Sequence, residues 1–146
     1  MPAIIETQKD NLTLSTDPKR LDIEAICVFL AQSYWANTRS RTTIERSLKN
    51  SLVFAVYDGD RQVAMARLVS DYSTFAWLCD VFVDPDYRNR GIGKWLMEEI
   101  LAHPDMQGLR RWTLVSSSAQ GLYSQFGFSP LQNPERWMEL FNPAAN

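Results

Sequence analysis

The sequence predicts a mixed α/β protein, in which helices cover a sheet that contains both antiparallel and parallel strand pairs. Apolar residues follow a helical spacing in the first part of the chain and change to strand-like runs from Leu52 onward. Between Phe75 and Val115, a strand, a loop, a helix and a second strand follow one another, an order that favours a parallel, right-handed crossover. The 146 residues suit one domain, so we expect a single domain over residues 1–146.

The first part of the chain predicts one short strand and two helices. Residues 11–15 alternate between apolar and polar types and predict the strand. Asp17-Pro18 is typical of a helix start, and Asp22 is the alternative cap. Thr42 and Glu45 form a capping-box pattern that opens the second helix. The apolar face of the first helix comprises Ile23, Ile26, Cys27, Leu30, Ala31 and Tyr34.

Three strands follow in succession. Residues 52–57 and 63–69 are rich in strand-forming residues, and Asp58-Gly59 between them marks a turn, so the two runs predict a hairpin. The third run, residues 75–83, stops at Asp84-Pro85. Short connections between these strands favour antiparallel pairing.

The last part of the chain predicts a helix, a strand, a helix and a final strand. The first helix covers residues 91–101 and is ended by Pro104, with Gly93, Leu96, Met97, Ile100 and Leu101 on one face. Residues 112–115 predict a strand, and residues 119–126 predict a helix for which Gly127 is the C-terminal stop. We expect the last strand near residues 136–140.

Composition and charge exclude several classes of protein. Fifteen basic and 17 acidic residues leave a net charge of −2, so no overall field would gather nucleic acid. Cys27 and Cys79 lie in apolar runs and are interpreted as reduced core residues of a cytoplasmic protein. The one histidine, His103, is expected on the surface at a helix end, and no metal site is expected. No apolar stretch approaches the ~18 residues of a membrane span.

The segment that carries chemistry is the loop after the third strand. Arg88, Arg90 and Lys94 surround Gly91 and Gly93, and the loop runs directly into a helix. The first N–H groups of a helix have no partners within it, and the helix dipole places partial positive charge there. Glycines allow a phosphate to approach the backbone closely. The loop therefore predicts a site for a pyrophosphate group.

Other phosphate-binding patterns fit this loop less well. A Walker loop needs Ser or Thr after Gly-Lys, but Trp95 follows Lys94. A dinucleotide fingerprint needs a third glycine where Leu96 stands. The pattern Arg88-x-x-Gly91-x-Gly93, preceded by Val-Phe-Val-Asp-Pro, resembles the acetyl-CoA signature of the GNAT superfamily of N-acetyltransferases.

A second segment strengthens the resemblance. Residues 119–128, Ala-Gln-Gly-Leu-Tyr-Ser-Gln-Phe-Gly-Phe, are similar to the family's Ala-x-x-Leu-Tyr-x-x-x-Gly-Phe segment at about the family's spacing from the loop. The resemblance is to a small, single-domain, bacterial-type member. It implies a GNAT-like fold with a mostly antiparallel sheet, a central parallel β-α-β crossover and splayed strands, in which the strand before the loop carries a bulge.

The resemblance also implies roles for individual residues. Tyr123 matches the general acid of the family and also lies among the positions that contact the coenzyme. Ser116 stands where the family often has Asn, which leaves that contact an open question. The coenzyme-binding positions are Val81, Phe82, Val83, Arg88, Asn89, Arg90, Gly91, Ile92, Gly93, Lys94, Ser116, Ala119 and Tyr123.

The general base and the acceptor site are less defined. Asp80 stands in an apolar run next to the coenzyme strand, where a carboxylate is costly unless it is used or paired, so it is either a base or substrate anchor or a structural group. Asp71 and Tyr72 are weaker candidates. Tyr34, Trp35 and Trp77 would line an acceptor site beside Asp80, or belong to the core instead. Arg39 and Arg41 would read an acidic group on the acceptor or remain solvated.

The resemblance implies an N-acetyltransferase that uses acetyl-CoA as co-substrate and no metal. The expected acceptor is the primary amine of a small molecule, attacked without a covalent enzyme intermediate. A non-catalytic acyl-CoA sensor on the same fold is the alternative, and a nucleotide-phosphate binder is a third option. We expect no nucleic-acid or membrane partner, with a homodimer as one option for the assembly.

Overall fold

The computed structural model describes residues 2–146, which divide into two compact units. The first unit ends at Val115 and contains the whole sheet, and the second runs from Ser116 to Asn146. None of the helices in the described residues is long and apolar enough to cross a bilayer.

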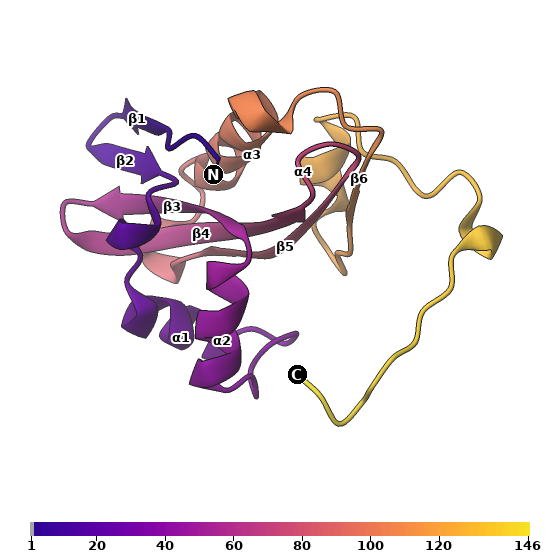
Figure 1. Cartoon of the computed structure of the whole chain (residues 1–146). Coiled ribbons are helices and arrows are strands. Elements are labelled where there is room, and N and C mark those ends of the chain that lie inside the picture. Colours follow the sequence, from indigo (N-terminus) through magenta and orange to yellow (C-terminus); the bar gives the residue numbers. More distant parts are fainter. Residues whose placement is uncertain (1) are drawn as a thin grey trace. The chain divides into compact units, whose positions relative to one another are not determined.

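One six-stranded sheet forms the centre of the first unit, and its strands lie side by side in chain order (Figure 1). Every neighbouring pair is antiparallel except β5 and β6, which are parallel. The predicted mixed sheet with one crossover is confirmed. The strands are β1 (Glu6–Lys9), β2 (Leu12–Ser15), β3 (Leu52–Asp58), β4 (Arg61–Ser70), β5 (Phe75–Val83) and β6 (Arg111–Leu114).

Helices cover both faces of this sheet. Helix α1 (Ile23–Ala31) and helix α2 (Arg41–Lys49) lie on one face, and helix α3 (Ile92–Ala102) lies on the other (Figure 1). Three short 3-10 helices complete the first unit at Pro18–Arg20, Pro85–Tyr87 and Pro104–Met106. In the second unit, helix α4 (Gln120–Ser124) is followed by a 3-10 helix at Pro134–Arg136.

The core beneath α1 and α2 anchors the functional strand. Phe82 of β5 stacks on Phe29 of α1 with ring centroids 4.9 Å apart. Complete burial of large apolar side chains is the main favourable term in folding, so this contact holds the end of β5 against the first helix. The buried residues of the cluster are Ile26, Phe29, Leu30, Ala36, Ile44, Leu48, Val53, Met65 and Phe82.

Helices α1 and α2 do not begin at the caps that the sequence favoured. Asp17 caps only the 3-10 helix, whereas Asp22 accepts a hydrogen bond from the Ala25 amide and starts α1, so the alternative cap is the one used. Ser40, not Thr42, caps α2 and accepts a hydrogen bond from the Thr43 amide. Ser40 has the extended backbone that a cap requires, which explains the difference.

His103 is completely buried, so its predicted surface position was wrong. Its Nε2 lies 2.8 Å from the Ala3 carbonyl oxygen, and its Nδ1 accepts a hydrogen bond from the Asp105 amide. The segment before β1 therefore covers the end of α3. Neither β1 nor this contact is indicated by the local pattern of residues 1–10, because both depend on a distant part of the chain.

The final strand expected near residues 136–140 is absent from the described residues. Trp137 instead follows a 3-10 turn and donates its amide hydrogen to the Pro134 carbonyl. A strand exists only where a neighbouring backbone pairs with it, and strand-forming side chains alone do not supply that partner. Gly127, the predicted helix stop, has the left-handed φ of 92° expected for that role.

Candidate functional site

A bulge interrupts strand β5 just before the predicted coenzyme positions. Arg67 of β4 pairs with Cys79, and Met65 pairs with Phe82, so β5 carries one more residue than β4 over this stretch. Asp80 lies in the bulge with φ of 48°, a left-handed value that is rare outside glycine. Side chains normally alternate between the two faces of a strand. Because of the extra residue, Asp80 and Phe82 lie on one face of β5 and Leu78 lies on the other. The bulge implied by the resemblance is confirmed.

The far edge of β5 is open beyond this bulge. Pairing between β5 and β6 ends at Leu78 and Leu114. The Asp84 amide donates to the Val63 carbonyl on the β4 side, and backbone groups alternate between the two edges of a strand. Val81 and Val83 therefore direct their N–H and C=O groups to the edge that β6 has left. An extended chain could pair with this edge as an added strand.

The loop between β5 and α3 has the backbone that an anion cradle requires. Asn89 and Gly91 have left-handed φ values of 63° and 77°. Gly91 precedes the first residue of α3 and provides no side-chain cap, so the first amides of the helix are not covered by a capping group. An added Cβ at Gly91 would meet open space, so this residue is required for its φ rather than for room. Ile92 is buried, whereas Gly93 is half-buried and Lys94 is exposed.

Two arginines are held along this loop. Arg88 donates from Nε to the Val83 carbonyl at 3.0 Å, and its guanidinium lies 5.5 Å from the Phe82 ring centroid. Arg90 donates to the Asp86 carbonyl and lies over the Tyr87 ring, whose hydroxyl donates to Asp58. Both side chains are exposed, and these contacts fix their direction at the loop. The combination can bind a diphosphate.

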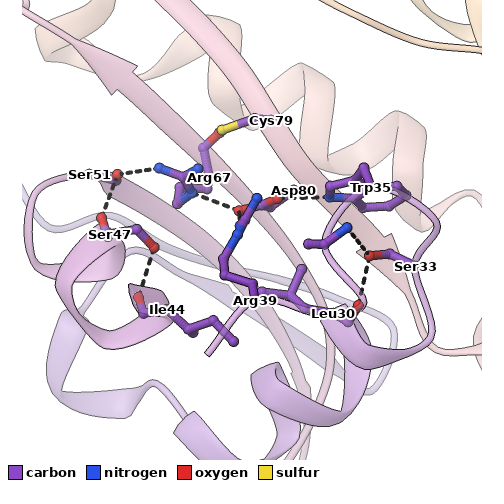
Figure 2. Close-up of polar contacts among 11 residues, drawn as sticks. Leu30, Ser33, Trp35, Arg39, Ile44, Ser47, Ser51, Arg67, Cys79 and Asp80 are labelled. Carbon is purple, nitrogen blue, oxygen red and sulfur yellow. Dashed lines mark hydrogen bonds and ion pairs between the residues drawn. The ribbon is translucent and has the colours of Figure 1, made fainter. Parts of the chain in front are cut away.

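Asp80 is the buried centre of a polar cluster that we call the Asp80 cluster: Trp35, Arg39, Arg67 and Asp80. Arg67 Nε donates to Asp80 Oδ2 at 2.7 Å, and Arg39 Nη1 donates to the same oxygen at 2.9 Å. The Trp35 indole N–H donates to Oδ1 at 2.8 Å. Figure 2 shows the donors converging on the carboxylate from β4 and from the segment between α1 and α2. Asp80 ties these elements to the bulge.

The electrostatics of the cluster keep Asp80 ionised. Burial by itself would raise the pKa of the Asp80 carboxyl, but the hydrogen bond from Arg67 and the charges of Arg67 and Arg39 outweigh it, and the pKa is lowered. A general base at neutral pH works best with a pKa near that pH. Of the two open interpretations of Asp80, the geometry favours the structural one.

Sequence reasoning missed Arg67. It contributes the shortest hydrogen bond of the cluster, and its Nη1 also donates to Ser51 Oγ at 3.1 Å (Figure 2). The available signal was a single charged residue in the otherwise apolar run of residues 63–69. A buried charge is costly without a partner, so this residue predicts an acid nearby but does not identify it.

Aromatic side chains lie beside the cluster on the same side of the sheet. Trp77 is 41% exposed and precedes the bulge on the face of β5 that carries Cys79. Tyr34 packs edge-to-face on Trp35 with centroids 5.2 Å apart and is mostly exposed. Trp35 and Trp77 are therefore surface residues that retain accessible ring area, rather than fully buried core. Burial raises the pKa of the Cys79 thiol to about 11, which leaves it protonated.

Asp71 belongs to a turn. Its carboxylate accepts hydrogen bonds from the Thr74 hydroxyl and from the amides of Ser73, Thr74 and Phe75, and these bonds lower its pKa. Tyr72, next to it, has a left-handed φ of 62° in the same turn. The geometry gives both residues a role in turn formation.

Comparison with known proteins decides the family. The model of the acetyltransferase (GNAT) domain matches residues 49–130, which is more than half of the chain. The chain belongs to the GNAT acetyltransferase family. A solved structure from Xanthomonas campestris pv. campestris, assigned to the GNAT family, is 44% identical, with a TM-score of 0.89 over 93% of this chain and 96% of that one.

More distant relatives of this GNAT protein agree with that assignment. The ribosomal-protein-S18-alanine N-acetyltransferase of Escherichia coli is 25% identical, with a TM-score of 0.65 over 81% of this chain and 77% of that one. A Gibberella zeae protein named as an acetyltransferase is 25% identical over 77% of this chain and 75% of its own length. The chain spans only 46% and 50% of two soybean acetyltransferases that it also matches.

The second unit of the GNAT chain carries the other predicted residues. Tyr123 lies on α4, is buried, and contacts Phe128 with ring centroids 6.1 Å apart. Burial raises the pKa of its phenol, so the hydroxyl is protonated at neutral pH. Ser116 Oγ accepts a hydrogen bond from the Ala119 amide at 2.9 Å and thereby organises the start of α4. Its hydroxyl hydrogen is left to donate elsewhere.

Proposed function

We propose that this GNAT protein transfers the acetyl group of acetyl-CoA to the primary amine of a small molecule. The observation that carries the proposal is the combination of the β5 edge, which β6 no longer pairs beyond Leu78, with the loop that follows it, where no side chain caps the first amides of α3. Acetyl-CoA has a diphosphate and an amide-containing pantetheine arm, and these are the two groups that such a loop and such an edge can bind.

The loop is the part suited to the diphosphate. We assign this contact to the amides of residues 89–94 and to the side chains of Arg88 and Arg90. The left-handed φ values at Asn89 and Gly91 and the uncapped first turn of α3 support this assignment, because such a backbone can form an anion-binding concavity. Lys94 is exposed on the first turn and adds a positive charge.

The open edge is the part suited to the pantetheine arm. We assign the pairing to the backbone of Val81 and Val83, with Phe82 between them packed into the core. The Val83 N–H is a candidate donor to the thioester oxygen, which gains negative charge as the amine attacks. Ser116 and Ala119 are assigned to the same arm on the basis of the family resemblance.

Tyr123 is assigned as the general acid. The leaving thiolate has an ordinary pKa near ~8.5, so a protonated phenol can neutralise it as the C–S bond breaks. The raised pKa of Tyr123 supports this role because it keeps the hydroxyl protonated. In the balanced reaction, the amine nitrogen forms the new C–N bond and gives its proton to water, the C–S bond breaks, and the thiolate takes the proton of Tyr123, which water then restores.

Asp80 is assigned to positioning rather than to proton transfer. Its carboxylate accepts three hydrogen bonds, two of them from guanidinium groups, and its pKa is lowered. Its contribution is to hold the bulge that separates β5 from β6, and so to keep the coenzyme edge open. Asp80 would therefore affect activity through the binding of acetyl-CoA.

The test is the release of free thiol from acetyl-CoA with a panel of primary amines, together with calorimetric binding of CoA, ATP and NAD. We expect turnover on at least one amine and clear preference for CoA. Tyr123→Phe should lower kcat by about 100-fold or more. Tyr72→Phe is the matched control, because that tyrosine lies in a turn, and it should keep the kcat of the unmodified protein.

Three outcomes would each contradict a part of the proposal. Tight binding of acetyl-CoA with no turnover on any amine would instead favour a sensor of acyl-CoA. A preference for ATP or NAD over CoA would remove the assignment of the loop to acetyl-CoA. An unchanged kcat in Tyr123→Phe would take Tyr123 out of the mechanism.

A further inference from the structure

The Asp80 cluster contains more positive than negative charge. Its ion pairs join two guanidinium groups to one carboxylate, which leaves one positive charge uncompensated. The side chains of Arg67 and Asp80 are only 10% and 2% exposed, so water screens this charge weakly. A cation in such a place attracts an anion.

Arg39 is the member of the cluster that can receive that anion. Its side chain is 15% exposed, against 10% for Arg67, so it is the more accessible of the two arginines. Arg39 donates to Asp80 through Nη1, whereas Arg67 donates to both Asp80 and Ser51. The planar guanidinium fork matches the two oxygens of a carboxylate.

The surroundings of Arg39 fit an organic molecule rather than a free ion. Trp35 bonds the other oxygen of the same carboxylate and keeps exposed ring area, and Trp77 is exposed on the same face of β5. Asp80 stands three residues before Val83, which corresponds to about 10 Å along a strand. An acceptor that carries its carboxylate and its amine at opposite ends of a carbon chain is long enough to reach from the Asp80 cluster toward the coenzyme edge.

Arg41 lacks these properties although it lies two residues away. Its side chain is 53% exposed and pairs with both Glu24 and Glu45. Its charge is thus more than balanced by its own neighbours. The structure separates two arginines that the sequence left equivalent.

We propose that Arg39 binds a carboxylate of the acceptor, so that the preferred substrates are amino acids whose reacting amine stands at the far end of a carbon chain, rather than simple amines. This inference rests on the proposed acetyl transfer and names its substrate class. Arg39 would set specificity through the positive charge that the Asp80 cluster leaves uncompensated. The amine end of the acceptor would lie toward the β5 edge, with its carbon chain against Trp35 and Trp77.

The experiment compares pairs of acceptors that differ only in the carboxylate, such as 6-aminohexanoic acid with pentylamine. The quantity measured is the ratio of kcat/KM within each pair, so that intrinsic differences in amine reactivity cancel between protein variants. We expect the unmodified protein to favour the amino acids. Arg39→Gln should reduce that preference by about 10- to 100-fold, as loss of a charged hydrogen bond does.

Two further variants keep the test specific. Arg41→Gln should retain the preference, and Arg39→Lys should recover part of it because the charge remains. Thermal unfolding of each variant shows whether it is folded, and in Arg39→Gln the carboxylate of Asp80 still keeps its bonds from Arg67 and Trp35. A ratio that is the same in Arg39→Gln and in the unmodified protein would overturn the proposal.

Direct binding separates this inference from the proposed function. N-acetyl amino acids and their decarboxylated counterparts are titrated into the CoA-bound protein by calorimetry, which needs no turnover. Carboxylate-dependent binding that Arg39→Gln abolishes supports the anion site even if no amine is acetylated, in which case only the acetyl transfer fails. Equal affinities for the N-acetyl amino acids and their decarboxylated counterparts would overturn the Arg39 proposal even if simple amines are acetylated.

Discussion

Replacing Asp80 by Asn tests whether the Asp80 cluster holds the bulge together. The substitution keeps the size of the side chain but removes the one anion that faces Arg67 and Arg39 at 2.7 and 2.9 Å. Breaking a buried ion pair in this way costs about 3–5 kcal/mol, because the remaining charge is left unpaired. For a chain of this length, the loss corresponds to a decrease in Tm of about 10 °C.

The loss of stability caused by Asp80→Asn should be smaller at acidic pH than at neutral pH. Because the pKa of Asp80 is lowered in the folded protein, its contribution is present above the unfolded pKa of about 4 and is lost as the pH falls through the folded pKa. The difference in stability between the unmodified protein and Asp80→Asn should therefore be full at pH 7 and shrink at the acid end. Asp80→Asn should also raise the KM for acetyl-CoA while leaving the pH dependence of kcat unshifted.

Urea denaturation followed by tryptophan fluorescence measures the free energy of unfolding at each pH. Asp60→Asn is the matched control, because Asp60 is exposed in the turn between β3 and β4, and it should change stability by less than about 0.5 kcal/mol. If the free energies of unfolding of Asp80→Asn and of the unmodified protein differ by less than about 1 kcal/mol at pH 7, the cluster does not stabilise the bulge. A shift in the acidic limb of kcat would return Asp80 to the role of general base.

Two further predictions concern backbone features. Gly91→Ala should lower the free energy of unfolding by about 1–2 kcal/mol, because an L-residue is strained at φ of 77° although its Cβ would meet open space. It should also weaken the binding of acetyl-CoA measured by calorimetry. An unchanged affinity would show that the loop does not bind the coenzyme. Ser40→Ala should lower the free energy of unfolding by about 1 kcal/mol, because it removes the cap of α2, whereas Thr42→Ala should change it by less than about 0.5 kcal/mol; equal losses in urea denaturation would contradict the assignment of the cap.

The strands and helices around the coenzyme loop were predictable because their signals are local. Residues 75–83 form the strand that the apolar run predicted, and Gly91 precedes α3 where the glycine and the following apolar spacing placed a helix start. The loop pattern required no knowledge of distant residues, because the amides that make a phosphate site are consecutive in the chain. The same holds for Gly127, which stops α4 through its own φ.

The features that escaped prediction all depend on distant partners. His103 is buried against distant parts of the chain: Phe54 packs edge-on against its ring, and its Nε2 contacts the carbonyl of Ala3, 100 residues away. The expected strand at residues 136–140 was read from its own side chains, but a strand needs a neighbouring backbone. Arg67 and Asp80 are 13 residues apart and belong to different strands, so each appeared only as a lone charge in an apolar run.

The amino-acid sequence by itself determined the order of the elements from β2 to β6, the glycine-containing loop before α3 and the family, because apolar periodicity, turn residues and glycines act over a few consecutive residues. Only the tertiary structure decided the state of Asp80 and the difference between Arg39 and Arg41. Those properties arise from charges brought within about 3 Å of one another, where weak screening in the interior makes each partner decisive. A sequence shows which charges exist, and the fold selects which of them meet.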